Sequence, residues 1–312
     1  MRPAPVLCLA LLGFVLSGCD SGDPAGFDFT KEDGEGELGV WVHSGRYNRK
    51  YFLHTPPGMS GAQRYPLLIF LHGGGEDGEA FHRRLRADAT TDAVGFITVY
   101  PSGMEDTWTV GCGQCTLAEV LEADDVSFIT TLIRHLADRL PVDTTRVYVA
   151  GFAQGGQLAQ LYGCQSDMPP AGIAGVAAAM FSVVSRECQP RGAFPVAIVH
   201  GDRDPLAFYD GYGIRASILS TSRTVDTWVR MMTCDSVPVL GERPDTARDG
   251  TWVTTYRFDG CAEGAAVVHF RVHNGGHTWP GDTGPWSVFN GTNSRNFDTT
   301  AEILEFFASL NP

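Results

Sequence analysis

Four short segments of the chain carry residue types suited to acyl transfer from carboxylic esters. They combine glycine-rich turns with histidine-bearing and carboxylate-bearing stretches, and each directly follows a strand candidate. Such a set can bind an oxyanion, present a nucleophile and support general acid–base catalysis. The segments are His-Gly-Gly-Gly-Glu at 72–76, Gly-Phe-Ala-Gln-Gly at 151–155, His-Gly-Asp-Arg-Asp-Pro at 200–205 and His-Asn-Gly-Gly-His-Thr-Trp-Pro-Gly at 273–281.

The segment at 151–155 has the form of a nucleophile elbow in which the nucleophile is missing. The apolar run Arg146–Ala150 leads into Gly-x-Ala-x-Gly, and the helix candidate Gln154–Cys164 follows. In the Gly-x-Ser-x-Gly elbow of ester hydrolases the central serine lies on a tight, strained turn, and flanking glycines avoid clashes with nearby backbone. Ala153 occupies that central position here. Alanine cannot form an acyl-enzyme.

The glycines at 73–75 predict an oxyanion hole. They come directly after the apolar run Pro66–Leu71, and glycine lets backbone N–H groups approach a developing oxyanion closely. A further amide comes from the residue after the nucleophile position, which is Gln154. We therefore expect Gln154, Gly74 and Gly75 to bind the oxyanion. The alternative is a glycine turn that only ends a strand.

A carboxylate and a histidine complete the set. Asp202 and Asp204 both follow the apolar run Phe194–Val199, and either could orient an imidazole. The chain order of nucleophile position, acid and histidine is that of α/β-hydrolases.

Two histidines, His273 and His277, follow the strand candidate Val267–Val272 on a glycine-rich loop. Their spacing of four would suggest a metal site on a helix. The Gly-Gly pair between them makes a helix implausible, so we assign no metal ligand there.

The apolar runs alternate with helical patterns along the chain. Val126–Leu140 has helical periodicity, and Thr300–Leu310 predicts a closing helix. Alternation of this kind predicts an α/β fold with a mostly parallel sheet and helices on both faces. Together with the chain order of the site residues, it indicates the α/β-hydrolase fold.

These motifs together resemble the secreted polyhydroxybutyrate depolymerase and feruloyl esterase family, over roughly residues 45–310. The most specific part of the resemblance is Gly-Gly-His-Thr-Trp-Pro-Gly at 275–281. The resemblance implies hydrolysis of carboxylic esters without a cofactor. It assigns the acid to Asp204, which precedes Pro205, and the catalytic histidine to His277.

The same resemblance implies further features. Trp108 matches a tryptophan-rich segment near the family's active site, and we expect Trp108 and Trp279 to line the substrate pocket. A disulfide is expected between Cys234 and Cys261. The implied partner is an ester substrate, either a polyester or a feruloylated or acetylated polysaccharide.

Two interpretations explain Ala153. The chain is a hydrolase carrying an engineered Ser→Ala change, or it is a natural pseudoenzyme that binds polyester or esterified polysaccharide at the cell surface. In either case the side chain at position 153 is what departs from the family pattern.

The N-terminus predicts export and a lipid anchor. Residues 1–18 combine a positive start with a short apolar run, as in a signal peptide, and Leu-Ser-Gly-Cys at 16–19 resembles a lipobox. We expect lipidation of Cys19 and tethering to a membrane, periplasmic or at the cell surface. The alternative is plain secretion. Residues 19–37 read as a flexible tether, and 38–312 as one catalytic-type domain.

The net charge and the cysteines bear on possible partners, disulfides and metal sites. The formal net charge of −13 argues against a nucleic-acid partner, because an acidic surface repels phosphate. Six cysteines remain beyond the signal segment and Cys19, and in an exported chain they predict disulfides. Cys112-Gly-Gln-Cys115 has neither a second such pair nor a histidine pair nearby, so the sequence alone assigns it no zinc.

Overall fold

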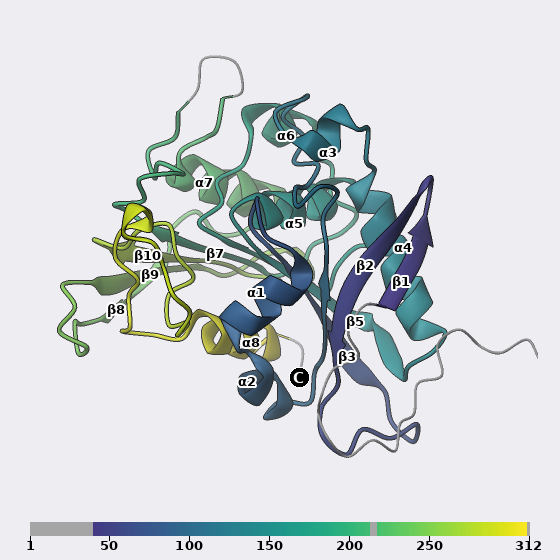
Figure 1. The fold of residues 1–312 in the computed structure, drawn as a ribbon. Helices are drawn as coiled ribbons and strands as arrows, with labels where there is room; N and C mark the ends of the chain where they lie inside the picture. The colour runs from purple at the N-terminus through teal and green to yellow at the C-terminus, as the bar shows by residue number, and fades with distance from the viewer. Residues whose placement is uncertain (1–39, 213–216, 311–312) are drawn as a thin grey trace, which may run out of the picture.

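The structure, a computed structural model, describes residues 40–212 and 217–310 (Figure 1). The predicted signal segment 1–18, the lipidation site Cys19 and the predicted tether 19–37 lie outside the described residues. Among the residues that are described, no helix has the length and apolar character needed to cross a membrane.

The described strands form one ten-stranded sheet in the order β1-β2-β4-β3-β5-β6-β7-β10-β9-β8. The six strands from β4 to β10 in that order pair in parallel, and two antiparallel strands flank them on each side. The strand bounds are Val40–Ser44 (β1), Tyr47–His54 (β2), Tyr65–Leu71 (β3), Ile97–Pro101 (β4), Val142–Phe152 (β5), Gly172–Val176 (β6), Val196–Gly201 (β7), Val239–Arg243 (β8), Trp252–Phe258 (β9) and Val267–His273 (β10).

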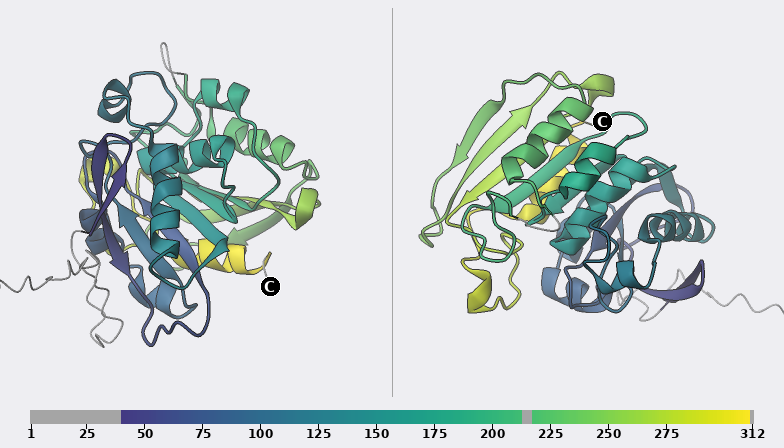
Figure 2. Two further views of the ribbon diagram at one scale, coloured as in Figure 1. Left: turned by 90° about the vertical axis from the view of Figure 1, so that its right-hand side faces the viewer. Right: turned by 90° about the horizontal axis from the view of Figure 1, so that it is seen from above.

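Helices cover both faces of the sheet (Figures 1 and 2). Central parallel strands are buried on both sides, which explains their continuous apolar runs; every residue of β3, β4, β6 and β7 is buried. The helix bounds are Gly78–Leu85 (α1), Asp88–Asp92 (α2), Leu117–Val120 (α3), Asp125–Ala137 (α4), Gln154–Gln165 (α5), Ser182–Glu187 (α6), Thr221–Met231 (α7) and Thr299–Ala308 (α8).

Two apolar clusters fill the space between the helices and the sheet. One contains Phe128 of α4, Leu158 of α5 and Trp228 of α7, while the other contains Phe81 of α1 and Phe307 of α8. Because successive strand residues point to opposite faces, the six parallel strands contribute to both clusters. The predicted α/β-hydrolase fold, with a mostly parallel sheet and helices on both faces, is confirmed.

The parallel strands bring the four segments of interest to one edge of the sheet. The segments lie at the carboxyl ends of β3, β5, β7 and β10, which all run parallel within the central part of the sheet. In open parallel sheets, ligands bind beyond the carboxyl ends of the strands. Segments separated by up to 200 residues in the sequence therefore meet at one site.

Three disulfides join the six cysteines of the described chain. They are Cys112–Cys115, Cys164–Cys188 and Cys234–Cys261, so the pair expected from the family resemblance is among them. Disulfides form and persist in oxidising compartments, so these bonds fit a protein that is exported.

Candidate active site

The elbow at Ala153 keeps a strained backbone although the serine is absent. Ala153 has φ 49° and ψ −115°, which a residue with a Cβ atom rarely adopts. Its N–H donates to the carbonyl of Val176 at 2.9 Å, and its own carbonyl accepts from the N–H of Gln157 at 3.0 Å. Neighbouring structure thus holds the turn in place.

Two glycines make this turn possible. A Cβ atom at Gly151 would overlap the backbone of Gly155, and one at Gly155 would overlap the carbonyls of Leu71 and His72. Strand β5, helix α5 and the loop after β3 therefore approach more closely than side chains would permit. The requirement for glycine at 151 and 155 comes from packing and is independent of any nucleophile.

Asp204 and His277 form a direct pair. Nδ1 of His277 lies 2.7 Å from Oδ2 of Asp204, and the Asp204 side chain is fully buried. With its proton on Nδ1, the neutral imidazole donates to the carboxylate and leaves a lone pair on Nε2. The ring also packs against Phe152 at a centroid distance of 4.9 Å. The histidine is therefore oriented by both a hydrogen bond and an aromatic neighbour.

Asp204 accepts several further hydrogen bonds. Its Oδ1 accepts from the N–H groups of Leu206 and Ala207 at 2.8 and 2.7 Å, and His200 Nε2 lies 3.1 Å from Oδ2. Burial alone would raise the pKa of Asp204, but the hydrogen bonds from His200 and His277 outweigh it and hold the pKa well below its usual value. The carboxylate therefore stays ionised.

His200 and Thr221 were missed by the sequence analysis as supporting residues. His200 is buried at the end of β7, and the Thr221 hydroxyl lies 2.7 Å from its Nδ1. Since Nε2 faces two acceptors, Asp204 and the carbonyl of Ala207, this nitrogen carries the proton. A polar residue at the end of an otherwise apolar strand was the available signal.

Asp202, the other candidate acid, belongs to a different cluster. Its Oδ2 accepts from Arg271 at 3.0 Å and lies 3.0 Å from Nδ1 of His273, and its Oδ1 accepts from the N–H of Asn274. Asp202 thus pairs with His273, and Asp204 pairs with His277. Asp202 anchors the start of the loop that carries His277.

The loop after β3 departs from the prediction at Gly75. The N–H of Gly75 donates to the carbonyl of Asp106 at 2.8 Å, and Gly75 is absent from the lining of the cleft at the elbow. Gly75 is therefore not available as an oxyanion donor, because its N–H is already used to shape the turn. Within the described residues, the N–H of Gly74 has no partner, and Gln154 opens α5, whose first N–H groups lack partners in the helix.

The expectation that Trp108 and Trp279 line the substrate pocket is wrong. Their exposed fractions are 0% and 1%. The indole N–H of Trp108 donates to the carbonyl of His72 at 2.9 Å, and that of Trp279 donates to Thr300 at 3.2 Å. Both side chains belong to the core, where the large ring fills space and its one donor is satisfied internally.

A cleft of about 390 Å³ joins the parts of the site. Its size falls in the range of small-molecule pockets. The lining combines backbone and small side chains at the elbow with both polar and apolar side chains: Gly73, Gly74, Glu76, Val110, Cys115, Thr116, Phe152, Ala153, Gln154, Gln157, Ala177, Phe181, Leu206, Ala207, Tyr212, Ile218, His277 and Asn290.

A second buried carboxylate lies close to this cleft. Arg84 pairs with Glu76, which lines the cleft, and also with Asp282, at 2.6 and 3.4 Å. The indole N–H of Trp286 donates to Asp282 at 2.6 Å, and the Trp286 ring contacts Phe152. Burial raises the pKa of Asp282 to about 6.

Comparison with known proteins identifies the family. Residues 49–212 match the family described as Esterase PHB depolymerase. The chain belongs to this esterase family. The fold, the elbow and the carboxylate–histidine pair described above are therefore found in a chain whose relatives are esterases.

Individual relatives agree with this membership. "Putative esterase NocK" of Nocardia uniformis subsp. tsuyamanensis is 31% identical over 85% of this chain and 80% of its own length. Feruloyl esterase B of Piromyces equi is 27% identical over 73% of this chain and 42% of its own length. The solved structure of acetyl xylan esterase from Aspergillus awamori covers 87% of this chain and 99% of its own, with a TM-score of 0.57 and 12% identity. That last likeness concerns the fold.

Proposed function

We propose that this chain binds carboxylic esters in an esterase site that lacks only the nucleophile hydroxyl. The observation that carries the proposal is the 2.7 Å pair of His277 with the buried Asp204, because His277 lines the same cleft as the strained elbow at Ala153. An ester held there cannot be converted to an acyl-enzyme, because alanine offers no nucleophilic atom.

The proposed roles follow from the contacts. With serine at position 153, Nε2 of His277 would accept the hydroxyl proton and return it to the leaving alcohol. Asp204 would hold the ring and stabilise the imidazolium. The N–H groups of Gln154 and Gly74 would bind the oxyanion.

The substrate class follows from the relatives and the cleft. Relatives named as feruloyl and acetyl xylan esterases favour an acyl group carried by a polysaccharide, while the family description favours a polyester. A cleft of about 390 Å³ suits one acyl group and part of its alcohol.

Binding of an uncleaved ester tests the proposal directly. We expect the chain to bind a feruloylated or acetylated xylo-oligosaccharide, or a hydroxybutyrate oligomer, by calorimetry, with the ester recovered intact by mass spectrometry. Ala153→Trp should abolish binding by filling the cleft at the elbow. Ala89→Trp, on an exposed position of α2, is the matched control.

Two outcomes would contradict this proposal. One is equal binding by both tryptophan variants, provided that circular dichroism shows both to be folded. The other is failure of all three ligands to bind the unmodified chain.

The origin of Ala153 has its own test. The codon at position 153 in the source gene separates an engineered Ser→Ala change from a natural pseudoenzyme.

We further propose that residues 38–312 form one catalytic-type domain, tethered through 19–37 to a lipidated Cys19. The motivation is the Leu-Ser-Gly-Cys sequence at 16–19. Cys19→Ala should move the protein from the membrane fraction to the soluble fraction. Unchanged membrane association would contradict the anchor.

A further inference from the structure

The Cys112–Cys115 disulfide lies in a loop between the cleft and a larger cavity. Cys115 lines the cleft, whereas Cys112 and Glu119 line a neighbouring cavity of about 750 Å³. Phe181 lines both spaces. The disulfide loop is thus part of the partition between the site already described and a second hollow.

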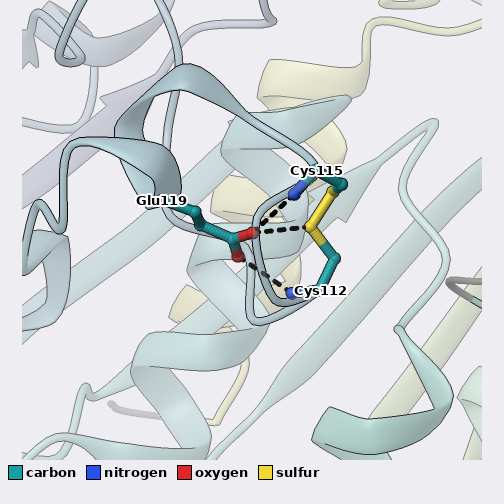
Figure 3. A group of neighbouring side chains, drawn as sticks. All are labelled: Cys112, Cys115 and Glu119. Atoms are coloured by element: carbon teal, nitrogen blue, oxygen red, sulfur yellow. Dashed lines mark hydrogen bonds between the residues drawn. A yellow bond between two sulfur atoms is a disulfide. The ribbon is translucent and has the colours of Figure 1, made fainter.

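Glu119 holds this loop through its backbone (Figure 3). Its Oε1 accepts from the N–H groups of Val110 and Cys112 at 3.2 and 2.9 Å, and its Oε2 accepts from the N–H of Cys115 at 3.0 Å. Thr116 in turn caps the short helix α3 that carries Glu119. The loop is therefore shaped by backbone hydrogen bonds to Glu119 as well as by the S–S bond.

The three disulfides differ in their surroundings. Cys164 is buried in the core and closes a separation of 24 residues with Cys188, and Cys234 and Cys261 are 27 apart and pack against the same core. Cys115 is exposed and only three residues from its partner. Short loops gain least from closure, and exposed disulfides are the labile ones.

The carboxylate of Glu119 also contacts the sulfur itself. Oε2 lies 2.8 Å from Sγ of Cys112. A disulfide sulfur carries no proton, so this contact becomes a hydrogen bond only after reduction, when the thiol can donate. A negative leaving sulfur beside a carboxylate is unfavourable until it takes a proton.

These observations define the reduction step. A thiolate of a dithiol reductant attacks Sγ of the exposed residue Cys115, the S–S bond breaks, and Cys112 leaves and takes a proton beside Glu119. The second thiol of the reductant then attacks the mixed disulfide and releases the thiol of Cys115. One cyclic disulfide and two protein thiols result.

We propose that this reduction opens a binding site for a thiophilic divalent cation such as Zn²⁺. Sγ of Cys112, Sγ of Cys115 and a carboxylate oxygen of Glu119 lie within 4.8 Å of one another. Glu119 supplies the third ligand that the sequence pattern around the two cysteines did not indicate. Water completes the tetrahedral set that zinc prefers, and binding releases the two thiol protons.

The backbone geometry suits this cation. Tetrahedral zinc with Zn–S bonds of about 2.3 Å needs its two sulfurs about 3.8 Å apart. The Cα atoms of Cys112 and Cys115 are 5.8 Å apart, so rotation of the side chains can separate the sulfurs. The hydrogen bonds from the loop to Glu119 hold the third ligand beside them.

The experiment uses the full chain under native conditions with a mild dithiol. Peptide mapping after thiol alkylation should find Cys112 and Cys115 reduced first, with the other two disulfides intact. After removal of the reductant without air, equilibrium dialysis against Zn²⁺ should find about one equivalent bound per chain. The oxidised chain should bind none.

Variants separate this site from adventitious binding. The double change Cys112→Ser and Cys115→Ser should abolish binding. Glu119→Gln should weaken it by tenfold or more, because residues that only support a metal ligand commonly contribute that much, and Glu119 is itself a ligand. Glu122→Gln is the matched control, since Glu122 lines the same cavity and is exposed. Zinc binding that survives the double change, or a selectively reduced chain that binds no zinc, would overturn the proposal.

Discussion

The two sides of the cleft differ in what they retain. At the elbow, Gly151 and Gly155 preserve a strained backbone at Ala153, but the side chain offers no chemistry. Across the cleft, Asp204 and His277 preserve both the side chains and their hydrogen bond. The first side is defined by backbone packing and the second by polar contacts.

This difference indicates that the fold alone sets the backbone conformation of the elbow, and that a nucleophile would add only a side-chain atom. The conformation of the elbow comes from close approach of β5, α5 and the loop after β3, so it persists without a hydroxyl group. Under the proposed function, a single oxygen atom distinguishes the chain from a complete triad.

The largest expected effect comes from Ala153→Ser. Serine adds one oxygen at a turn that already accommodates a Cβ atom, so no new backbone strain arises. We expect kcat/KM for a short-chain p-nitrophenyl or feruloyl ester to rise on the order of 10³-fold or more. Removing the serine from a working triad lowers the rate by at least that factor, so restoring it should raise the rate correspondingly. Initial rates measured by released nitrophenol or ferulate check this.

A control keeps the result interpretable. His277→Ala in the Ala153→Ser background should return the rate to that of the unmodified chain, because the serine then lacks its base. A folded Ala153→Ser variant that hydrolyses none of the acetyl, feruloyl and hydroxybutyrate esters would show that the acid–base side is not competent.

The second expectation compares the two aspartates in the Ala153→Ser background. Asp204→Asn should lower kcat by about 10³-fold or more, because the amide favours the wrong tautomer of the histidine. Asp202→Asn, a matched change two residues away, should change kcat by less than about tenfold, since Asp202 contacts Arg271 and His273 instead. Similar losses in both variants would contradict the assignment of the acid to Asp204.

Much of the site could be predicted because its signals are local. Gly-x-Ala-x-Gly after an apolar run marks two positions, Gly151 and Gly155, where neighbouring backbone leaves no room for a side chain. The choice between Asp202 and Asp204 could not come from the residues alone, since both follow the same strand. It came from the family resemblance, and it agrees with the separate clusters in which the two side chains lie.

The failures have physical reasons as well. Trp279 lies within a site segment and Trp108 matches a segment of the resembling family, but aromatic side chains fill cores as readily as pockets, and these two are buried. Strand β6, Gly-Ile-Ala-Gly-Val, was not predicted because glycine and alanine lack the usual strand signal. Its small residues are required by close packing, since a Cβ atom at Gly172 would crowd the ring of Phe307.

The third expectation tests the backbone side of the cleft through stability. Gly155→Ala places a Cβ atom against two backbone carbonyls that cannot move independently. We expect a loss of about 3 kcal/mol in the free energy of unfolding, at the upper end of overpacking costs. Gly61→Ala is the matched control, because its Cβ would meet nothing within 4 Å, and its effect should stay within about 1 kcal/mol. Denaturant titration measures both, and equal effects would contradict the packing account.

The smallest expected effect concerns the two buried carboxylates near the cleft, whose pKa values move in opposite directions. Asp204 is held below its usual range, so its contribution to stability is lost as the pH falls. Burial raises the pKa of Asp282 from 3.8 to about 6. Between pH 3.8 and about pH 6, the folded chain binds more protons at Asp282 than the unfolded chain does. The contribution of Asp282 to stability is therefore full below pH 4 and is lost as the pH rises through 6.

Asp282→Asn should remove this dependence while keeping an oxygen that can accept from the indole of Trp286. We expect the free energy of unfolding of the unmodified chain, minus that of the variant, to fall by about 2–3 kcal/mol between pH 4 and pH 7. Urea titrations at several pH values measure this difference, and comparing the two proteins at each pH cancels the other carboxylates. A difference that rises with pH would mean that the ion pair with Arg84 outweighs burial, and the carboxylate of Asp282 would then be a stabilising charge beside the cleft.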